Sequence, residues 1–278
     1  MIPSALSAGQ FETVYNFLSL VIASQLFTAI FLLVSLPRLL PRYRNAIVVA
    51  VIVCGIAAYH YFRIFDSFKA AFVSKTAGGT GTYHQAVGAA FNEGYRYVDW
   101  LLTVPLLLAE LVVVLKLAKH RTRSLLVRLG VAAVAMIALG WPGEIANPDS
   151  GARTLFGVLS TIPFVYILYV LFVELGRSLD RQSSRVRKLV DGLRYIVLAT
   201  WGVYPLAYIA PSVIDDAAVA EVARQVGYSV ADVLAKPLFG LLVLAIAVLK
   251  SQADGYEPAG DPDDGVAVPD DVSSLTTR

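Results

Sequence analysis

The sequence predicts an all-α membrane protein in which seven transmembrane helices form one bundle. Of its 278 residues, 57% are hydrophobic and only 16% are charged, and the charged residues cluster between long apolar stretches. This distribution is typical of polytopic helical membrane proteins. Seven stretches reach the roughly 20 residues that a helix needs to cross a bilayer. They lie near residues 11–37, 45–72, 91–116, 124–143, 153–178, 186–211 and 217–250.

Each stretch is expected to cross the membrane as a helix. Several are apolar around most of their circumference, which excludes surface helices of a soluble domain. The first is too long for a signal peptide and lacks a basic leader, so we expect it to stay in the mature protein. We therefore predict one transmembrane domain over residues 1–250. Residues 251–278 are rich in Asp, Gly, Pro and Ser and should form a disordered, acidic cytoplasmic tail.

The basic residues predict the orientation of the bundle. They lie in alternate connections, while the other connections carry mainly acidic residues, among them Glu93, Glu144 and Glu221. Because basic connections face the cytoplasm, the amino terminus should lie outside and the carboxyl terminus inside. The net charge of +2 then reflects orientation and does not indicate a nucleic-acid partner. The basic residues are Arg38, Arg42, Arg44, Lys116, Lys119, Arg121, Arg123, Arg177, Arg181, Arg185, Arg187 and Lys188.

The third stretch carries polar side chains along one face. On a helix, Asp99, Thr103 and Glu110 fall within about 40° of one another, with Asp99 and Glu110 about 16 Å apart along the axis. Arg96, one turn outside Asp99, can stabilise the ionised form of that carboxyl. Glu110 has only apolar neighbours along the chain, so we expect it to be protonated at rest. One carboxyl would then accept a proton and the other would donate one.

The last stretch carries Asp232 and Lys236, whose spacing of four residues places them on one helical face. Ionisable residues at membrane depth are costly and therefore indicate function. A desolvated lysine amine is also the usual partner of an aldehyde cofactor, with which it forms a Schiff base. A plain salt bridge between packed helices is the alternative, as are a helix cap at Glu110 and an interfacial position for Arg96. The single cysteine, Cys54, indicates neither a disulfide framework nor a metal site.

Three motifs together resemble the microbial rhodopsins. The third stretch contains Arg-Tyr-x-Asp-Trp-Leu-x-Thr-x-Pro-Leu-Leu-Leu, the sixth contains Trp-x-x-Tyr-Pro-x-x-Tyr, and the last contains Asp-x-x-x-Lys. The resemblance covers all seven helices and implies that Lys236 binds all-trans retinal as a protonated Schiff base, with Asp99 and Asp232 as counterions. Aromatic walls and a small glycine suit a rigid polyene. The pocket residues that the resemblance implies are Tyr97, Trp100, Thr103, Leu107, Met136, Gly140, Ser160, Phe164, Trp201, Tyr204, Pro205 and Tyr208.

The resemblance further implies a light-driven outward proton pump, which is a transporter and not an enzyme. Asp99 and Thr103 with Glu110 match the pumps that use a glutamate donor, as proteorhodopsins and xanthorhodopsins do. The alternative is a sensory photoreceptor that signals to a transducer, although such members usually lack a carboxylic donor. Leu107 matches the green-absorbing members. The family resemblance also implies a prokaryotic plasma membrane, contact with lipid, and a homo-oligomer that is either a pentamer or a trimer.

Two further residues point to the xanthorhodopsin-like branch. His60, in the second stretch, is expected by this resemblance to hydrogen-bond Asp99 and so tune its proton affinity. Gly157 stands where most members carry a bulky aromatic residue, and in relatives such a glycine accompanies a carotenoid that passes excitation to retinal. We expect a hydroxylated carotenoid near Gly157, with close helix packing as the alternative role. Glu144 and Glu221 are candidates for releasing the proton outside, and the sequence does not decide between them.

Overall fold

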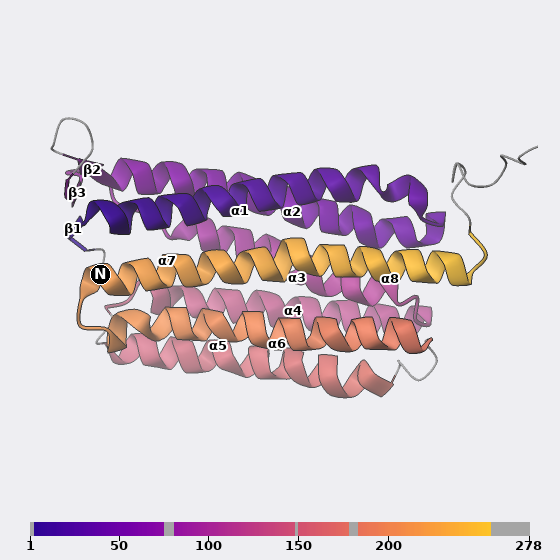
Figure 1. Cartoon of the computed structure of the whole chain (residues 1–278). Coiled ribbons are helices and arrows are strands. Elements are labelled where there is room, and N and C mark those ends of the chain that lie inside the picture. The colour runs from indigo at the N-terminus through magenta and orange to yellow at the C-terminus, as the bar shows by residue number, and fades with distance from the viewer. Residues whose placement is uncertain (1–2, 75–80, 148–149, 178–182, 257–278) are drawn as a thin grey trace, which may run out of the picture.

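Seven helical spans lie side by side in a bundle (Figure 1), which confirms the predicted fold class. The computed structural model describes residues 3–74, 81–147, 150–177 and 183–256. The last span is continuous and contains a π-helical turn. The spans are α1 (Ala8–Val34), α2 (Pro41–Ala71), α3 (Gly94–Val114), α4 (Lys119–Glu144), α5 (Gly151–Tyr169) with the π-helical turn η2 (Val170–Glu174), α6 (Ser184–Val213), and α7 (Ala217–Val233) with η4 (Leu234–Leu238) and α8 (Phe239–Ala253).

Polar caps begin several of these helices. Ser7 and Gln10 form a capping box at α1, because the Ser7 hydroxyl accepts from the Gln10 amide and the Gln10 side chain accepts from the Ser7 amide. Such side chains satisfy amide groups that a first helical turn leaves unpaired. Side chains at the start of three other helices do the same: Ser150 at α5, Ser183 at α6 and Asp216 at α7.

The first and last helical spans end at residues that differ from the predicted ones. The first helix stops at Val34, short of the predicted residue 37, and continues as the 3₁₀ turn η1 (Leu36–Arg38). Pro37 has no amide hydrogen to continue the helical ladder. At the other end of the chain, α8 extends to Ala253, three residues past the predicted domain boundary. Residues 257–278 of the predicted tail lie outside the described residues.

A small antiparallel sheet, which we did not predict, lies at the same end of the bundle as the amino terminus (Figure 1). Its strands have the order β1-β3-β2, and Leu6 and Val73 pair with Tyr83 and His84 of the central strand. Strands this short show no alternating pattern that a sequence could reveal. The Tyr83 ring stacks on Phe11 with centroids 3.8 Å apart, which packs the sheet against α1. The strands are β1 (Ala5–Leu6), β2 (Phe72–Ser74) and β3 (Tyr83–Gln85).

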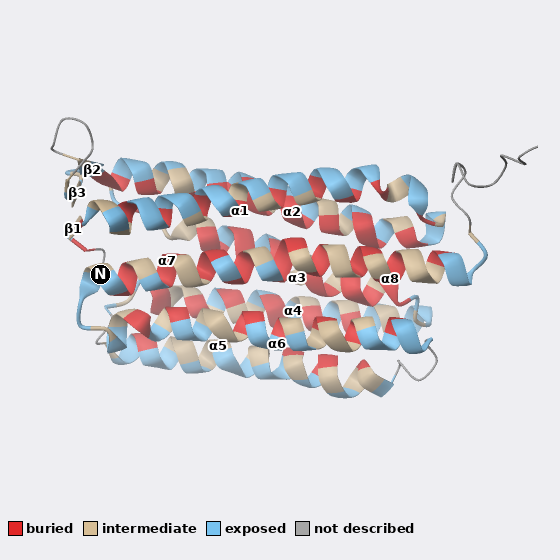
Figure 2. Ribbon diagram, viewed as in Figure 1, coloured by how far each residue is buried: buried red, intermediate tan, exposed pale blue. Residues whose placement is uncertain are grey.

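Burial divides each helix into two faces. Figure 2 shows buried residues on the faces that point into the bundle and exposed residues on the outer faces. Many exposed side chains are large and apolar, for example Phe27 at 66% and Leu206 at 64% exposure. An apolar outer surface is stable only against lipid, so the burial pattern agrees with a membrane-spanning bundle. The interior, by contrast, holds a series of buried charged side chains.

The π-helical turn η4 interrupts the last span at the site that the sequence singled out. It contains Lys236 and Pro237, and both are buried. A proline lacks the amide hydrogen of a regular helical turn, and a π turn accommodates such a break by widening locally. The turn therefore sets the direction in which Lys236 leaves the helix.

Candidate functional site

Lys236 lies at the centre of a buried cluster of charges. Its Nζ atom is 2.8 Å from Oδ2 of Asp99 on α3 and 2.8 Å from Oδ1 of Asp232 on α7. All three side chains are buried. A buried cation requires anionic partners, and two carboxylates with one lysine leave one negative charge for a further cation to balance. The structure thus brings together the three residues that the sequence paired across two helices.

The two carboxylates differ in their hydrogen bonds. Asp232 accepts from Tyr61 at 2.6 Å, from the indole of Trp100 at 3.3 Å, and from Tyr204. Asp99 accepts only from Lys236, through Oδ2, while its Oδ1 has no partner among the described residues. Hydrogen bonds to a carboxylate stabilise its ionised form. Asp232 is therefore the better stabilised anion, and Asp99 is the carboxylate with a free position for a proton.

Thr103 and Glu110 continue along α3 from Asp99. The Thr103 hydroxyl donates to the main-chain carbonyl of Asp99 at 2.8 Å, so it contacts the helix and not the carboxylate. Glu110 is fully buried, and neither of its carboxyl oxygens has a hydrogen-bond partner in the described part of the chain. An ionised carboxylate in this position would be uncompensated, so the neutral acid is the stable form.

The predicted hydrogen bond between His60 and Asp99 does not form in this structure, and the tuning role of His60 stays a prediction. The Nδ1 atom of His60 and the Oδ1 atom of Asp99 both lack partners within the described ranges, and the imidazole instead lies edge-on to the ring of Tyr59. Successive residues of a helix point about 100° apart. The neighbouring Tyr61 points toward Asp232 and donates to its carboxylate, so the His60 side chain points in a different direction.

Arg96 also differs from the expected arrangement. Its guanidinium is buried, but the groups that it contacts are the Tyr61 hydroxyl at 2.8 Å and Oε1 of Gln225 at 2.6 Å. It reaches Asp232 through Tyr61, which donates to that carboxylate. Arg96 is thus the nearby cation that balances the Lys236 cluster, although no hydrogen bond joins it to Asp99.

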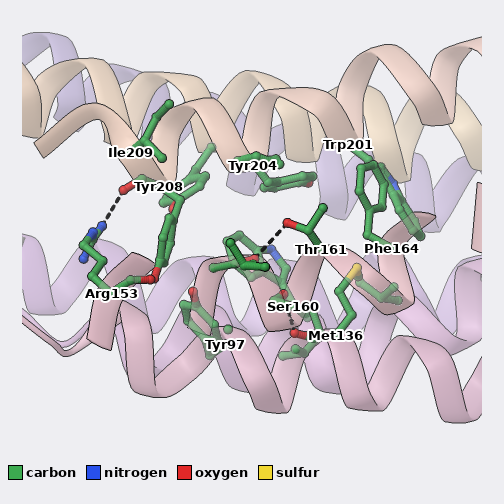
Figure 3. Close-up of a pocket in the computed structure, with 18 of the residues that line it drawn as sticks. Tyr97, Met136, Arg153, Ser160, Thr161, Phe164, Trp201, Tyr204, Tyr208 and Ile209 are labelled. Atoms are coloured by element: carbon green, nitrogen blue, oxygen red, sulfur yellow. Dashed lines mark hydrogen bonds between the residues drawn. The ribbon is translucent and has the colours of Figure 1, made fainter. Parts of the chain in front are cut away.

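A cavity of about 500 Å³ opens beside Lys236. Figure 3 shows Trp201 and Tyr204 of α6 across the cavity from Tyr97 and Met136. Every predicted pocket residue except Thr103 lines it, and so do Gly157 and Lys236. The predicted residues that line the cavity are Tyr97, Trp100, Leu107, Met136, Gly140, Ser160, Phe164, Trp201, Tyr204, Pro205 and Tyr208.

Two glycines make room at the cavity wall. A Cβ atom at Gly140 would come within 3.3 Å of the Ser160 hydroxyl and 3.6 Å of the Tyr97 ring. A Cβ atom at Gly157 would come within 3.2 Å of the Tyr208 ring, which lies across this glycine. A side chain at either position would therefore narrow the cavity or displace an aromatic neighbour.

A cluster of ionic side chains that we did not predict lies at the end of the bundle that carries the amino terminus. Arg224 on α7 donates to Glu93 at 2.7 Å, to Glu144 at 2.5 Å and to Glu221 at 2.6 Å. Gln225 follows it and joins two of these carboxylates, Glu93 and Glu221, to Arg96. The signal was present, because Arg224 is a second basic residue within the last apolar stretch. The structure brings both sequence candidates, Glu144 and Glu221, to this one cation.

Comparisons with known proteins agree with this architecture. A family model described as bacteriorhodopsin-like protein matches residues 12–250. The green-light absorbing proteorhodopsin of Gamma-proteobacterium EBAC31A08 is 29% identical over 233 residues, covering 84% of this chain and 85% of that protein. Archaerhodopsin-2 of Halobacterium sp. (strain aus-2) is 28% identical over 225 residues, covering 81% of each.

Solved structures give higher identities. The crystal structure of thermophilic rhodopsin superimposes with a TM-score of 0.86 at 46% identity, covering 92% of this chain and 100% of that one. The structure of xanthorhodopsin, whose authors describe a light-driven ion pump with dual chromophore, has a TM-score of 0.85 at 45% identity with the same coverage.

The chain belongs to the bacteriorhodopsin-like family of microbial rhodopsins. It is accordingly a multi-pass protein of a prokaryotic cell membrane and falls among light-driven ion transporters, not enzymes. Membership implies a retinal chromophore, and the residues at the cavity fit one. An amine flanked by carboxylates opens onto the cavity, its walls are aromatic, and Gly140 leaves space that a side chain would fill.

Proposed function

We propose that this chain is a light-driven outward proton pump in which Lys236 carries retinal. The observation that supports this proposal best is the unequal pair of carboxylates at Lys236 combined with the isolated Glu110 on the same helix as Asp99. A pump needs an acceptor and a donor on opposite sides of the proton that moves. Asp99 and Glu110 meet that requirement in a single helix.

Residues of this chain hold and move the proton at Nζ of Lys236. When bound there, retinal supplies absorption of visible light, isomerisation and a protonated Schiff-base nitrogen. Asp232 stays ionised because three neighbouring side chains donate to it. Asp99 accepts the proton because its Oδ1 atom is free and its distance from Nζ requires no long movement. Proton transfer from Nζ to Asp99 neutralises both groups, and Asp232 is then balanced by Arg96, which reaches it through Tyr61.

Glu110 returns a proton to Nζ from the other side. It holds that proton at rest because no cation or hydrogen-bond donor in the described structure compensates its carboxylate. Glu110 lies eleven positions after Asp99, which corresponds to about 16 Å along a helix, so the return step needs a transient path. Leu107 and the other apolar residues between them exclude water at rest.

The direction of proton transport follows from which end of the bundle carries the basic connections. Asp99 lies toward the end that carries Glu93 and the small sheet, and Glu110 lies toward the end that carries the basic connections after α1, α3 and α5. Under the positive-inside rule, the acceptor faces the outside and the donor faces the cytoplasm. This orientation places the amino terminus outside and the tail after residue 250 inside. The pentamer or trimer that the resemblance implies stays a prediction.

Light-driven acidification of an unbuffered cell suspension tests the proposal. Cells that express the chain with retinal should acidify the medium on illumination, and a protonophore should abolish the change. Loss of colour with hydroxylamine would establish the retinal linkage independently. A coloured protein that never acidifies the medium would favour the sensory photoreceptor.

We further propose that the cavity admits a carotenoid antenna at Gly157. The cavity extends from Lys236 past Gly157 to Val158 and Val213, which are 58% and 68% exposed on the outer faces of α5 and α6. An apolar opening of this kind lets a long flat polyene lie beside the pocket from the lipid side. Hydroxyls of Thr154 and Thr161 on the same wall offer partners for a hydroxylated or oxygenated carotenoid ring.

A further inference from the structure

Arg96 is held away from the carboxylates that would attract it most strongly. Its two terminal nitrogens donate to Tyr61 and to Gln225, and its guanidinium lies over the rings of Tyr61 and Tyr228 at 5.4 Å and 4.9 Å. The Nε atom is 3.8 Å from Glu93, too far for a hydrogen bond. The guanidinium therefore forms its hydrogen bonds with neutral partners although the Glu93 carboxylate lies within ion-pair distance.

Gln225 occupies the position between this cation and those anions. It is fully buried; its Oε1 accepts from Arg96 at 2.6 Å, and its Nε2 donates to Glu93 at 2.8 Å and to Glu221 at 3.0 Å. The orientation of the amide is unambiguous, because guanidinium groups only donate and carboxylates only accept. Gln225 thus hydrogen-bonds to the Arg96 guanidinium and to the two carboxylates at once, and its side chain separates the cation from these anions.

A second cation would stabilise the three carboxylates that surround Arg224. Arg224 serves Glu93, Glu144 and Glu221 at once. Burial raises the pKa of Glu93 above its usual value, although Arg224 beside it favours the ionised form. The carboxylate of Glu93 is therefore incompletely stabilised, and Arg96 is close enough to move toward it. The titratable and charged groups around Gln225 are Tyr61 of α2, Glu93 and Arg96 at α3, Glu144 of α4, and Glu221, Arg224 and Tyr228 of α7.

We propose that Gln225 is a positioning residue that holds Arg96 on the inner side, beside Tyr61 and Asp232, and prevents it from hydrogen-bonding to Glu93 and Glu221, so that the 3.8 Å ion pair with Glu93 stays loose. This inference rests on the proposed pump, because it concerns the field at the proton acceptor. With Arg96 held inward, its charge favours ionised Asp99 and Asp232. Without Gln225, Arg96 swings outward to the carboxylates, and Asp99 takes up a proton more readily.

The experiment is a spectroscopic titration of the purified, retinal-bound protein in the dark. Protonation of Asp99 removes a negative charge beside the chromophore and shifts the visible absorption, so the midpoint pH of the colour change reports the field there. Gln225→Met keeps the side-chain volume and removes both hydrogen-bonding groups. We expect its midpoint to rise by about one pH unit, as for a cation withdrawn by a few ångströms.

Two further variants decide whether Gln225 acts through Arg96. In an Arg96→Gln background, Gln225→Met should produce no additional shift. Gln25→Met is the matched control, because Gln25 is a fully buried amide on α1 that donates only to the main-chain carbonyl of Asp232 at 3.4 Å. Its midpoint should stay in place.

The outcomes separate this inference from the pump itself. A coloured Gln225→Met protein with an unmoved midpoint would overturn the role of Gln225, and so would an equal shift in the Arg96→Gln background. Failure of the native protein to acidify the medium would instead refute the proposed pump. If Gln225→Met yields no coloured protein, Gln225→Asn, which is too short to bridge the two sides, replaces it with the same expected shift.

Discussion

At the scale of single residues, the proposed function depends on three buried carboxyls that differ in the number of hydrogen bonds they accept. Asp232 receives several donors, Asp99 receives one, and Glu110 receives none in the described structure. All three are fully buried, so exposure does not distinguish them. Hydrogen bonds to a carboxylate favour its ionised form. In the proposed pump, the same side-chain chemistry thus supplies a fixed counterion, an acceptor and a donor.

The attachment site gives the first prediction. Lys236→Ala should abolish visible absorbance after addition of retinal, because no amine remains in the cavity. The variant also leaves Asp99 and Asp232 without their shared cation, so misfolding could produce the same result. Lys236→Arg separates the two explanations, since it keeps a cation but cannot form the Schiff base. It should fold and stay colourless; a coloured variant of either kind would refute the assignment.

The acceptor and the donor give the second prediction. Asp99→Asn should shift the absorption to longer wavelength and abolish pumping, because it removes a counterion charge and the acceptor together. Glu110→Gln should leave the resting colour almost unchanged and slow reprotonation by roughly 10²-fold, the usual contribution of a positioned acid. Flash photolysis measures both. Decay of Glu110→Gln at the native rate would show that another residue donates the proton.

Leu107 gives the third prediction at this scale. It is buried at 3% exposure in the cavity wall. Leu107→Gln places a dipole beside the polyene and should shift the absorption maximum to shorter wavelength. The neighbouring Leu108 is equally buried but does not line the cavity, so Leu108→Gln serves as the control in an absorption spectrum. Equal spectra for the native protein and Leu107→Gln would mean that Leu107 does not face the chromophore.

At the scale of helices, Arg153 joins three elements at one end of the cavity. Its guanidinium donates to the main-chain carbonyls of Gly143 and Glu144 at the end of α4 and of Tyr208 in α6, while its own carbonyl accepts from the Tyr208 hydroxyl. Helix ends expose carbonyls that lack intrahelical donors. Arg153 therefore fixes how α5 sits against α4 and α6 next to Gly157.

Loss of Arg153 should weaken the packing of α5 against α4 and α6. Arg153→Met removes charge-assisted hydrogen bonds whose combined contribution is about 2–3 kcal/mol, so the temperature at which half the colour is lost should fall by several degrees. Arg128→Met is the control, because Arg128 pairs with Glu174 in a bridge whose side chains are 38% and 22% exposed. Such exposed pairs contribute at most about 1 kcal/mol. Equal bleaching temperatures for the two variants would contradict a special role for Arg153.

The elements also show what a sequence alone can predict. Asp99, Thr103 and Glu110 were predictable because membrane-depth polar residues are rare and one helix fixes their mutual spacing, and the same reasons apply to Lys236 and Asp232 on the last span. The cluster around Arg224 was not predictable as a whole. Arg224 is visible as a basic residue in the last apolar stretch, but Glu93 and Glu144 come from other segments, and no local pattern sets how helices rotate against one another. The absent His60–Asp99 contact has the same cause, since it depends on the rotation of α2 against α3.

At the scale of the whole molecule, polar contacts form a continuous series from the cavity to one end of the bundle. Lys236 contacts Asp232, Tyr61 joins Asp232 to Arg96, and Gln225 joins Arg96 to the carboxylates around Arg224. On the opposite side of Lys236, the buried residues of α3 between Thr103 and Glu110 are apolar. In the proposed pump, this asymmetry lets protons pass through one half of the protein and keeps the other half closed until light changes it.

The outer surface gives the last prediction, which concerns the antenna. If a carotenoid lies in the opening at Gly157, purified protein incubated with hydroxylated carotenoids should show structured carotenoid bands in the excitation spectrum of retinal fluorescence. Gly157→Trp should remove those bands, since even a Cβ atom there meets the Tyr208 ring at 3.2 Å and a tryptophan fills the opening. Leu155→Trp is the matched control, because Leu155 is 55% exposed on the same helix and does not line the cavity. It should retain the bands. Bands absent with every carotenoid tried, in a protein that pumps normally, would leave Gly157 with a single role, which is to make room for Tyr208.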